Sequence, residues 1–370
     1  MYYDCKKREV TSLSADLSQA QRLALTHITN YARSRKDDAE RTIREILHMT
    51  NVERETYEDA VMKLKTHARV ALHFHPDRPD AAMRSIAEAL LENGTYKSQF
   101  ETFISNGSVS AYPGGERDLW EKNLFGGAYQ IDGATDNERP KYGALDVMLH
   151  PDGPAPRFGS CYFLLYPEVS RRCTYTYLDS HQDPKDKGTL EEFDLVIAAL
   201  MRDAFVSECA LGERNLTAGS LVRHLLVNLE LPFQDPSQEQ PCRNLNHYIE
   251  AQVHGDISLQ EDVSMLVADP SFQGTHVGEI LEQLCLKYAI DLYWHRGFSL
   301  SAEQVPADFR GPSMPSLAQR IAQGGWIDAS MIGAAAMDLK RHPHAWSDRG
   351  TYQEVLQELK LMWHVLVKYG

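Results

Sequence analysis

Hydrophobic residues near the start of the chain recur at intervals of three and four positions. Between residues 14 and 68 this spacing joins positions such as Leu25, Ile28 and Ile43, and neither Gly nor Pro interrupts the run. A period near 3.6 residues is typical of amphipathic helices that bury one face. We therefore predict a helical N-terminal region made of two or three helices.

The pattern changes at Val70, where polar and apolar side chains begin to alternate. From there to about residue 259, runs rich in β-branched and aromatic residues lie between clusters of Gly and Pro, as is typical of strands joined by turns. These runs predict strands at residues 70–74, 161–166, 173–178 and 248–253. Helical periodicity interrupts the strands at about residues 81–93, 191–210 and 218–229.

Helical spacing returns from Pro312 to the end, where Val355, Leu359, Trp363 and Leu366 form one apolar stripe. A strand-rich region between two helical regions indicates an α+β fold. We predict an N-terminal helical region over residues 1–69, a core over residues 70–300 and a C-terminal helical extension over residues 301–370.

The overall charge bears on the class of partner. Among the 370 residues, 38 Lys and Arg stand against 52 Asp and Glu, which gives a net charge of −14. A surface with this surplus repels phosphate backbones, so nucleic acid is disfavoured as a partner. The hydrophobic share of 43% is typical of a globular protein.

Three features favour a cytosolic protein without a membrane segment. The longest apolar run, at residues 195–201, is far shorter than a membrane-spanning helix needs. No apolar segment follows the charges at the N-terminus, as a signal peptide would require. The six cysteines include no Cys-x-x-Cys pair and indicate reduced thiols. Delivery as an effector by a specialised secretion route stays open.

The densest polar cluster is the run His73-Phe-His75-Pro-Asp77-Arg78. On a strand, His73 and His75 project to the same face because the side-chain period is two. Together with Asp77 these imidazoles could bind a metal ion in a hydrolase. The further ligands that such a site needs would come from distant histidines: His181, His254 or His295.

Two other interpretations of this cluster compete with the metal site. His75-Pro-Asp-Arg78 after a basic helix resembles the signature of the J-domain co-chaperones, which are interaction proteins. Alternatively, His75 and Arg78 at a strand end could hold the ribose and diphosphate of a dinucleotide, since a guanidinium matches phosphate geometry.

Two later segments could form the wall of a ligand pocket. Ser105-Asn106-Gly107-Ser108 predicts a turn rich in hydrogen-bonding groups, where Gly107 allows close approach of the backbone. Arg117 follows a pair of glycines. Neither segment matches a P-loop or a Rossmann fingerprint.

The last candidate lies on the predicted strand over residues 248–253. Period-two alternation places Glu250, Gln252 and His254 on one face and apolar residues on the other. A carboxylate at such a position lies at the edge of a core, either paired with a cation or available for catalysis.

The order of five runs resembles a bacterial and fungal family catalogued as a domain of unknown function, over about residues 60 to 340. The runs are residues 72–78, 138–143, 158–163, 248–255 and 308–315. This resemblance identifies a family and implies no mechanism.

A more distant resemblance does imply a mechanism. Tyr142-Gly143 and the runs at residues 163–169, 173–180 and 250–255 are similar to the strand succession of ADP-ribosyltransferase toxin-type domains. The resemblance implies an ADP-ribosyltransferase-like split β-sheet core. It also implies an enzyme that cleaves its co-substrate NAD and transfers ADP-ribose to an acceptor, here an unknown protein. This sequence has Tyr248 where members that modify arginine or asparagine carry Glu or Gln.

The resemblance also implies a role for each candidate. Glu250 would be catalytic, stabilising the oxocarbenium-like state of the ribose, with no metal ion. The NAD-binding residues would be His73, His75 and Arg78 at the ribose and diphosphate, Ser105, Asn106 and Gly107 at the nicotinamide, and Arg117 and Tyr142 in the pocket wall.

Overall fold

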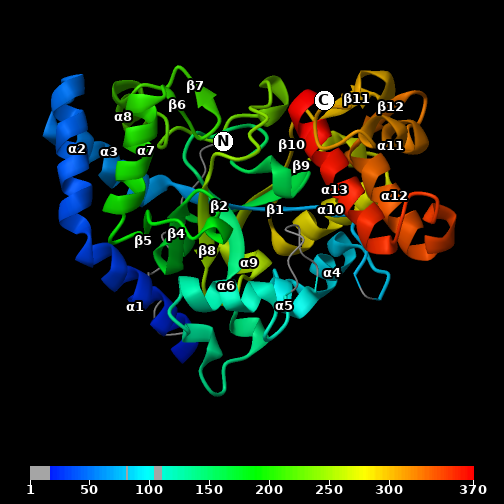
Figure 1. The fold of residues 1–370 in the computed structure, drawn as a ribbon, viewed down its shortest axis with the longest axis horizontal. Helices are drawn as coiled ribbons and strands as arrows, with labels where there is room; N and C mark the ends of the chain where they lie inside the picture. Colours follow the sequence, from blue (N-terminus) through cyan, green and yellow to red (C-terminus); the bar gives the residue numbers. More distant parts are fainter. Residues whose placement is uncertain (1–16, 81, 104–110) are drawn as a thin grey trace.

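The structure is a computed structural model that describes residues 17–80, 82–103 and 111–370 (Figure 1). Its first three helices are α1 (Gln19–Ser34), α2 (Lys36–Thr50) and α3 (Arg54–His67). Ser18 caps α1 by accepting a hydrogen bond from the Gln21 amide, and Asn51 ends α2 in the left-handed conformation. Three helices are thus present over residues 19–67, where the sequence predicted two or three.

Eight strands form the central sheet, in the order β10-β9-β3-β1-β2-β8-β4-β5. Their bounds are β1 (Arg69–Phe74), β2 (Lys141–Asp146), β3 (Cys161–Leu165), β4 (Cys173–Tyr177), β5 (Lys187–Thr189), β8 (Ile249–Val253), β9 (Val263–Ala268) and β10 (Asp291–Trp294). The four strands predicted from the sequence correspond to β1, β3, β4 and β8. With the helices around this sheet, the α+β class is confirmed.

The first strand lies in the middle of this sheet. Ala71 is paired with Ala144 of β2 on one side and with Leu164 of β3 on the other, both antiparallel. The resemblance implied a split sheet, whereas here β1 joins the two halves into one hydrogen-bonded sheet. The residues that follow β1 are therefore held at a central position.

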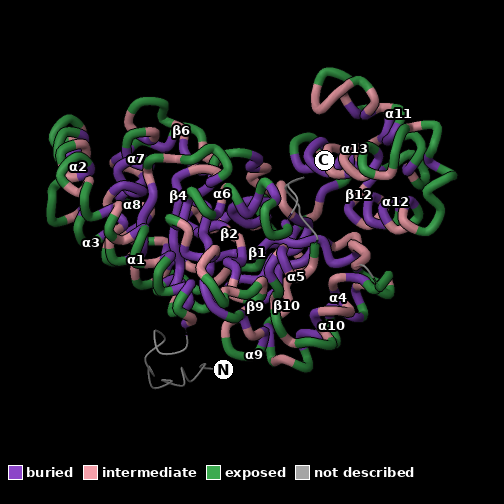
Figure 2. The backbone as a smooth tube through the Cα atoms, turned by 60° about the horizontal axis from the view of Figure 1, so that its bottom comes forward, coloured by how far each residue is buried: buried purple, intermediate pink, exposed green. Residues whose placement is uncertain are grey.

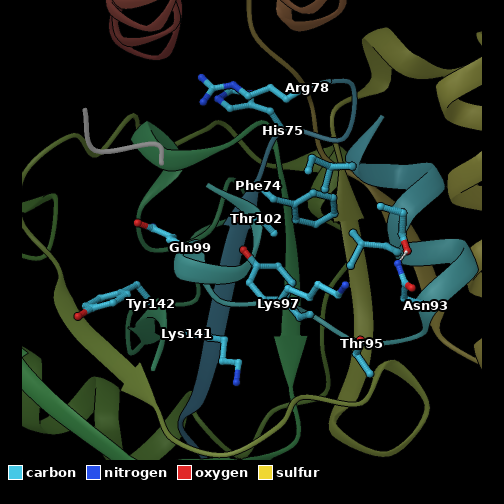
Figure 3. A pocket seen from close by; sticks show the side chains of 14 residues that line it. Phe74, His75, Arg78, Asn93, Thr95, Lys97, Gln99, Thr102, Lys141 and Tyr142 are labelled. Atoms are coloured by element: carbon cyan, nitrogen blue, oxygen red, sulfur yellow. Dashed lines mark hydrogen bonds between the residues drawn. The ribbon is translucent and has the colours of Figure 1, made fainter. Parts of the chain in front are cut away.

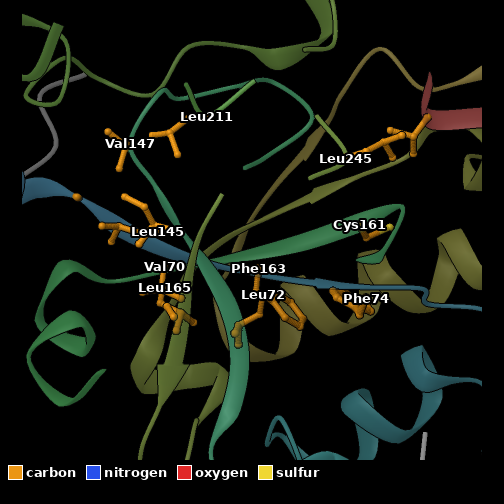
Figure 4. Packing of buried hydrophobic residues seen from close by; sticks show 14 of the residues in the cluster. Val70, Leu72, Phe74, Leu145, Val147, Cys161, Phe163, Leu165, Leu211 and Leu245 are labelled. Atoms are coloured by element: carbon orange, nitrogen blue, oxygen red, sulfur yellow. The ribbon is translucent and has the colours of Figure 1, made fainter. Parts of the chain in front are cut away.

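Both faces of β1 are buried, and each contributes to a different hydrophobic cluster. Val70, Leu72 and Phe74 pack into the main core together with Phe163 of β3 (Figure 4). Ala71 lies on the other face, in a smaller cluster. Figure 2 shows the strands as the buried centre of the molecule, whereas many residues of α2 and α3 are exposed.

Ten helices surround the sheet and the two small hairpins in the described part of the chain after β1. They are α4 (Ile86–Asn93), α5 (Gln99–Thr102), α6 (Glu116–Leu124), α7 (Asp194–Val206), α8 (Ala218–Val227), α9 (Leu259–Asp262), α10 (His276–Tyr288), α11 (Met314–Ile321), α12 (Ala329–Arg341) and α13 (Tyr352–Tyr369). In the described residues, no helix combines the length and the apolar character that spanning a membrane requires.

The C-terminal region is helical, as predicted, but it also contains a hairpin. Strands β11 (Ser299–Ser301) and β12 (Trp326–Asp328) pair beside α12, and a second hairpin consists of β6 (Cys209–Ala210) and β7 (Glu213–Arg214). The predicted stripe of α13 is buried along its length. The red helix α13 lies over the end of β1 in Figure 1 and is close to the His-Pro-Asp-Arg run.

Candidate functional site

A cavity of about 80 Å³ lies where β1, β2 and β8 meet α6. Four candidates from the sequence line it together: His73, Arg117, Tyr142 and Glu250. The remaining lining residues are Tyr96, Gln99, Trp120, Gly143, Ala155, Phe158 and Asp179. Segments far apart in the sequence thus bring a carboxylate, a guanidinium, an imidazole and aromatic rings to one place.

Glu250 is the buried carboxylate of this cavity. It lies in the middle of β8, opposite Ala144 of β2 and Thr176 of β4, and only 5% of its surface is exposed. Burial, and then the charge of Asp179, raise the pKa of Glu250 to about 7. A carboxyl group with this pKa can exchange a proton at neutral pH.

Two neighbours fix the orientation of the Glu250 side chain. Ser180 Oγ and Gln252 Nε2 both donate to Oε1 of Glu250, the second over 2.9 Å. Gln252 is held in turn by Thr174, whose hydroxyl donates to Gln252 Oε1 over 2.7 Å. In the described part of the chain, both of these hydrogen bonds are made to Oε1 of Glu250 and neither is made to Oε2. The protein therefore anchors the carboxylate through Oε1.

Ser180 and Asp179 are site residues that the sequence analysis did not single out. They follow β4 directly, and the hydroxyl of Tyr248 donates to Asp179 Oδ2 over 3.0 Å. A polar Asp-Ser pair at the end of an aromatic strand was the available signal. It could not be interpreted because nothing in the sequence shows that β4 is paired with β8.

Helix α6 carries Arg117 and Trp120 to the cavity, and a buried ion-pair network fixes this helix. Arg139 Nη1 lies 2.9 Å from Glu121 Oε2, and its other terminal nitrogen contacts Asp118. Burial raises the pKa of Glu121 to about 7, against the attraction of Arg139. The run at residues 138–143 therefore contributes a structural arginine that sequence reasoning had not assigned.

Arg117 lies against two aromatic rings that also contact each other. Its guanidinium carbon lies 4.6 Å from the centre of the Trp120 ring and 5.1 Å from that of the Tyr142 ring. Cation–π contacts of this kind hold a guanidinium in a fixed plane and lower the cost of its burial. The predicted assignment of Arg117 and Tyr142 to the pocket wall agrees with this geometry.

Both ring nitrogens of His73 are bonded to backbone groups. Nδ1 lies 3.3 Å from the carbonyl oxygen of Gly159, to which it donates, and Nε2 accepts from the Ala155 amide over 3.2 Å. Burial lowers the pKa of His73 to about 3, so the ring is neutral. These bonds leave no lone pair of His73 for a metal ion.

His75 and Arg78 line a second cavity of about 100 Å³, which shares Tyr96, Gln99 and Tyr142 with the first. Figure 3 shows the two side chains at one end of this cavity, with Lys141 at the other. The remaining candidates Ser105, Asn106 and Gly107 lie outside the described residues.

Asp77 turns toward α12, where its carboxylate occupies the space that a Cβ atom at position 333 would need. Burial raises the pKa of Asp77 to about 7. Within the described residues, the one group of three potential metal ligands is instead His150, Glu213 and Cys242. The hypothesis of a metal site at His73, His75 and Asp77 therefore has no support in the geometry.

The surroundings of the His-Pro-Asp-Arg run also differ from those of a J-domain, where it joins two helices of a hairpin. Here the run follows β1, a central strand of the sheet, and the His75 ring packs edge-on against Trp363 of α13 at 5.1 Å. This setting does not favour the co-chaperone alternative.

Comparison with known proteins identifies a family for this chain. No curated protein matches the chain. Residues 69–369 match the family described as "Protein of unknown function (DUF3626)", and this stretch begins at β1 and includes both cavities. This match agrees with the family resemblance seen in the sequence. The chain belongs to the DUF3626 family of proteins of unknown function.

Proposed function

We propose that this protein is an NAD-dependent ADP-ribosyltransferase, which cleaves the bond between nicotinamide and ribose and transfers ADP-ribose to a protein acceptor. The observation that carries the proposal is the position of Glu250, anchored through one oxygen, in the same cavity as Arg117 and Tyr142. An ADP-ribosyltransferase-like arrangement of β1, β2, β4 and β8 within the continuous sheet is part of the proposal and rests on the sequence resemblance.

Glu250 suits a reaction in which positive charge develops on the ribose. Departure of nicotinamide leaves an oxocarbenium-like centre, which a nearby carboxylate stabilises. The pKa of about 7 means that Glu250 is partly protonated at neutral pH before substrate arrives. Only the ionised form of Glu250 can stabilise the positive centre in this way.

Two buried polar atoms of the cavity residues suit the carboxamide of nicotinamide. In the described part of the chain, Trp120 Nε1 and Gln99 Oε1 are buried without hydrogen-bond partners. The indole can donate to a carboxamide oxygen, and the glutamine oxygen can accept from a carboxamide nitrogen. Since buried polar groups without partners are costly, a ligand that bonds to both would be stabilised.

Release of nicotinamide from NAD by the purified protein tests this proposal, with Glu250→Gln as the decisive variant. We expect this variant to bind NAD almost normally, while turnover falls by roughly a hundred- to a thousandfold. Glu282→Gln, a change at an exposed position of α10, is the matched control and keeps full turnover. If well-folded Glu250→Gln releases nicotinamide as fast as the natural protein, the catalytic assignment is wrong.

A further inference from the structure

A cluster of four cationic side chains and one neutral histidine lies beside the Glu250 cavity and has no role in the cleavage step described above. It consists of Arg78 after β1, Arg157 in the short 3-10 helix Pro156–Phe158, Arg310 in the loop before α11, and Lys360 and His364 on α13. We call these five residues the cationic cluster. Three of the runs that resemble the DUF3626 family, at residues 72–78, 158–163 and 308–315, contribute to it or border it.

Specific contacts bring three of these four segments together, and the charge of Arg310 acts on Lys360 and His364. The indole of Trp363, next to His364, donates to the Pro156 carbonyl oxygen over 2.8 Å and thus ties α13 to the segment of Arg157. The same indole packs against the ring of His75, three residues before Arg78. The cluster is therefore built by the packing of α13 on the end of β1.

Three side chains of the cluster, those of His364, Arg157 and Arg310, have buried nitrogens without a hydrogen-bond partner in the described residues. His364 is 2% exposed, and neither of its ring nitrogens has a hydrogen-bond partner within the described residues. The Nε atoms of Arg157 and Arg310 are likewise buried without partners in that part of the chain. A buried polar group without a partner is costly, so a ligand that bonds to these nitrogens would offset a substantial penalty.

The side chains of the cluster act on one another electrostatically. Burial, and then the charges of Arg157, Arg78 and Arg310, lower the pKa of Lys360 to about 8, whereas Asp179 acts in the opposite direction. Burial and the same cations, with Lys360, lower the pKa of His364 to about 3. The cations therefore repel one another, and an anion placed among them would relieve this repulsion.

The cluster adjoins the candidate site on two sides. The Arg157 guanidinium lies 4.9 Å over the ring of Phe158, which lines the Glu250 cavity. Arg78 lines the second cavity, which shares three residues with the first. An extended ligand could therefore reach both Glu250 and the cationic cluster.

We propose that the cationic cluster is a binding site for a diphosphate group. Guanidinium and ammonium groups are the side chains that recognise phosphate oxygens, the former by paired hydrogen bonds. Arg310 has a positive φ of 65°, a strained conformation that often marks a ligand-binding position. That the diphosphate belongs to a nucleotide such as NAD rests on the proposed function, whereas the anion site itself does not.

Titration calorimetry at constant ionic strength tests the site with pyrophosphate, ADP-ribose and adenosine. We expect pyrophosphate and ADP-ribose to bind and adenosine, which carries no phosphate, to bind at least tenfold more weakly. Tighter binding of ADP-ribose than of pyrophosphate would identify a nucleotide as the source of the diphosphate, and equal binding would identify free diphosphate. Absence of binding by both phosphorylated probes would overturn the proposal.

Variants separate this site from an ordinary structural cluster. Arg310→Gln and Lys360→Gln should each weaken pyrophosphate binding roughly ten- to a hundredfold, because a charge-assisted bond is lost. Without ligand, both should raise the melting temperature, since each removes a partly buried charge that is repelled by its neighbours. Arg341→Gln, at an exposed position of α12, should change neither quantity.

The outcomes for the two proposals can be told apart. Pyrophosphate binding without nicotinamide release would retain the anion site and reject the proposed function. The opposite outcome is nicotinamide release together with pyrophosphate binding that Arg310→Gln and Lys360→Gln leave unchanged. That outcome would overturn the proposed diphosphate site at the cationic cluster and would not affect the role of Glu250.

Discussion

The hydroxyl of Tyr142 donates a hydrogen bond to Oε1 of Glu121 over 2.9 Å. This bond joins β2, which lines the cavity, to α6, which carries Arg117. The other carboxylate oxygen of Glu121 accepts a hydrogen bond from Arg139. The buried carboxylate of Glu121 therefore connects Tyr142 to Arg139. The geometry around Arg117 is therefore set by the protein before any ligand binds.

Replacing Arg139 should show how far the fold depends on this network. Arg139→Met keeps the length of the side chain but leaves the buried carboxylates of Glu121 and Asp118 without their cation. We expect the free energy of unfolding, measured by urea denaturation, to fall by about 3–5 kcal/mol. Lys122→Met, at an exposed position of the same helix, is the control and should change little. A loss as small as that of the control would show that the network is not needed for stability.

The pH dependence of stability should reveal the raised pKa of Glu250. The unfolded chain has a pKa near 4.5 at this residue and the folded protein has one of about 7. Between these values the folded state binds more protons, so the contribution of Glu250 to stability falls as pH rises. Relative to the natural protein, Glu250→Gln should therefore gain stability from pH 5 to pH 8, by up to about 3 kcal/mol.

Denaturation of both proteins at the two pH values measures this difference. Glu282→Gln should track the natural protein at both, because its carboxylate is exposed. An equal difference between Glu250→Gln and the natural protein at pH 5 and pH 8 would contradict a raised pKa.

Gln252 should act as a positioning residue through Glu250. Gln252→Leu removes a donor to Glu250 Oε1, and loss of a bond to the charged form raises the pKa of the carboxyl group. The midpoint of the pH–rate profile for nicotinamide release should therefore move to higher pH, and kcat should fall more than KM changes. If the variant only lowers the melting temperature and keeps the profile of the natural protein, Gln252 is purely structural.

Position 333 offers a test of the packing of α12 against the end of β1. Gly333→Ala would normally favour a helix, but here the added methyl group overlaps the Asp77 carboxylate. We expect a net loss of about 1–3 kcal/mol in urea denaturation. In the double variant with Asp77→Ala most of this loss should disappear, whereas additive losses would show that the two residues do not contact each other.

Local patterns in the sequence were sufficient for the elements and for some of the site. Alternation located β1 and β8, and it placed Glu250 and Gln252 on one face, as the structure has them. The same pattern could not show that both nitrogens of His73 are bonded to backbone groups, because those groups come from residues 155 and 159. Hydrogen bonds to residues distant in the sequence therefore argue against His73 as a metal ligand.

The cationic cluster was beyond the reach of sequence patterns. Lys360 and His364 follow the ordinary spacing of an amphipathic helix, and the run around Arg310, at residues 308–315, resembles the family but implies no role for the arginine. Their significance depends on α13 packing over the end of β1, a contact between opposite ends of the chain. No local period encodes that contact.

The central place of β1 also affects how the chain reaches its fold. Ala71 is paired with Ala144 and with Leu164, so β1 acquires its neighbours only after long loops have closed. Folding slows when native contacts join distant residues, because the entropy of loop closure is lost before the contacts form. Until β2 and β3 arrive, an apolar strand has two open edges on which other chains can pair. Refolding from denaturant should therefore be slow and sensitive to protein concentration.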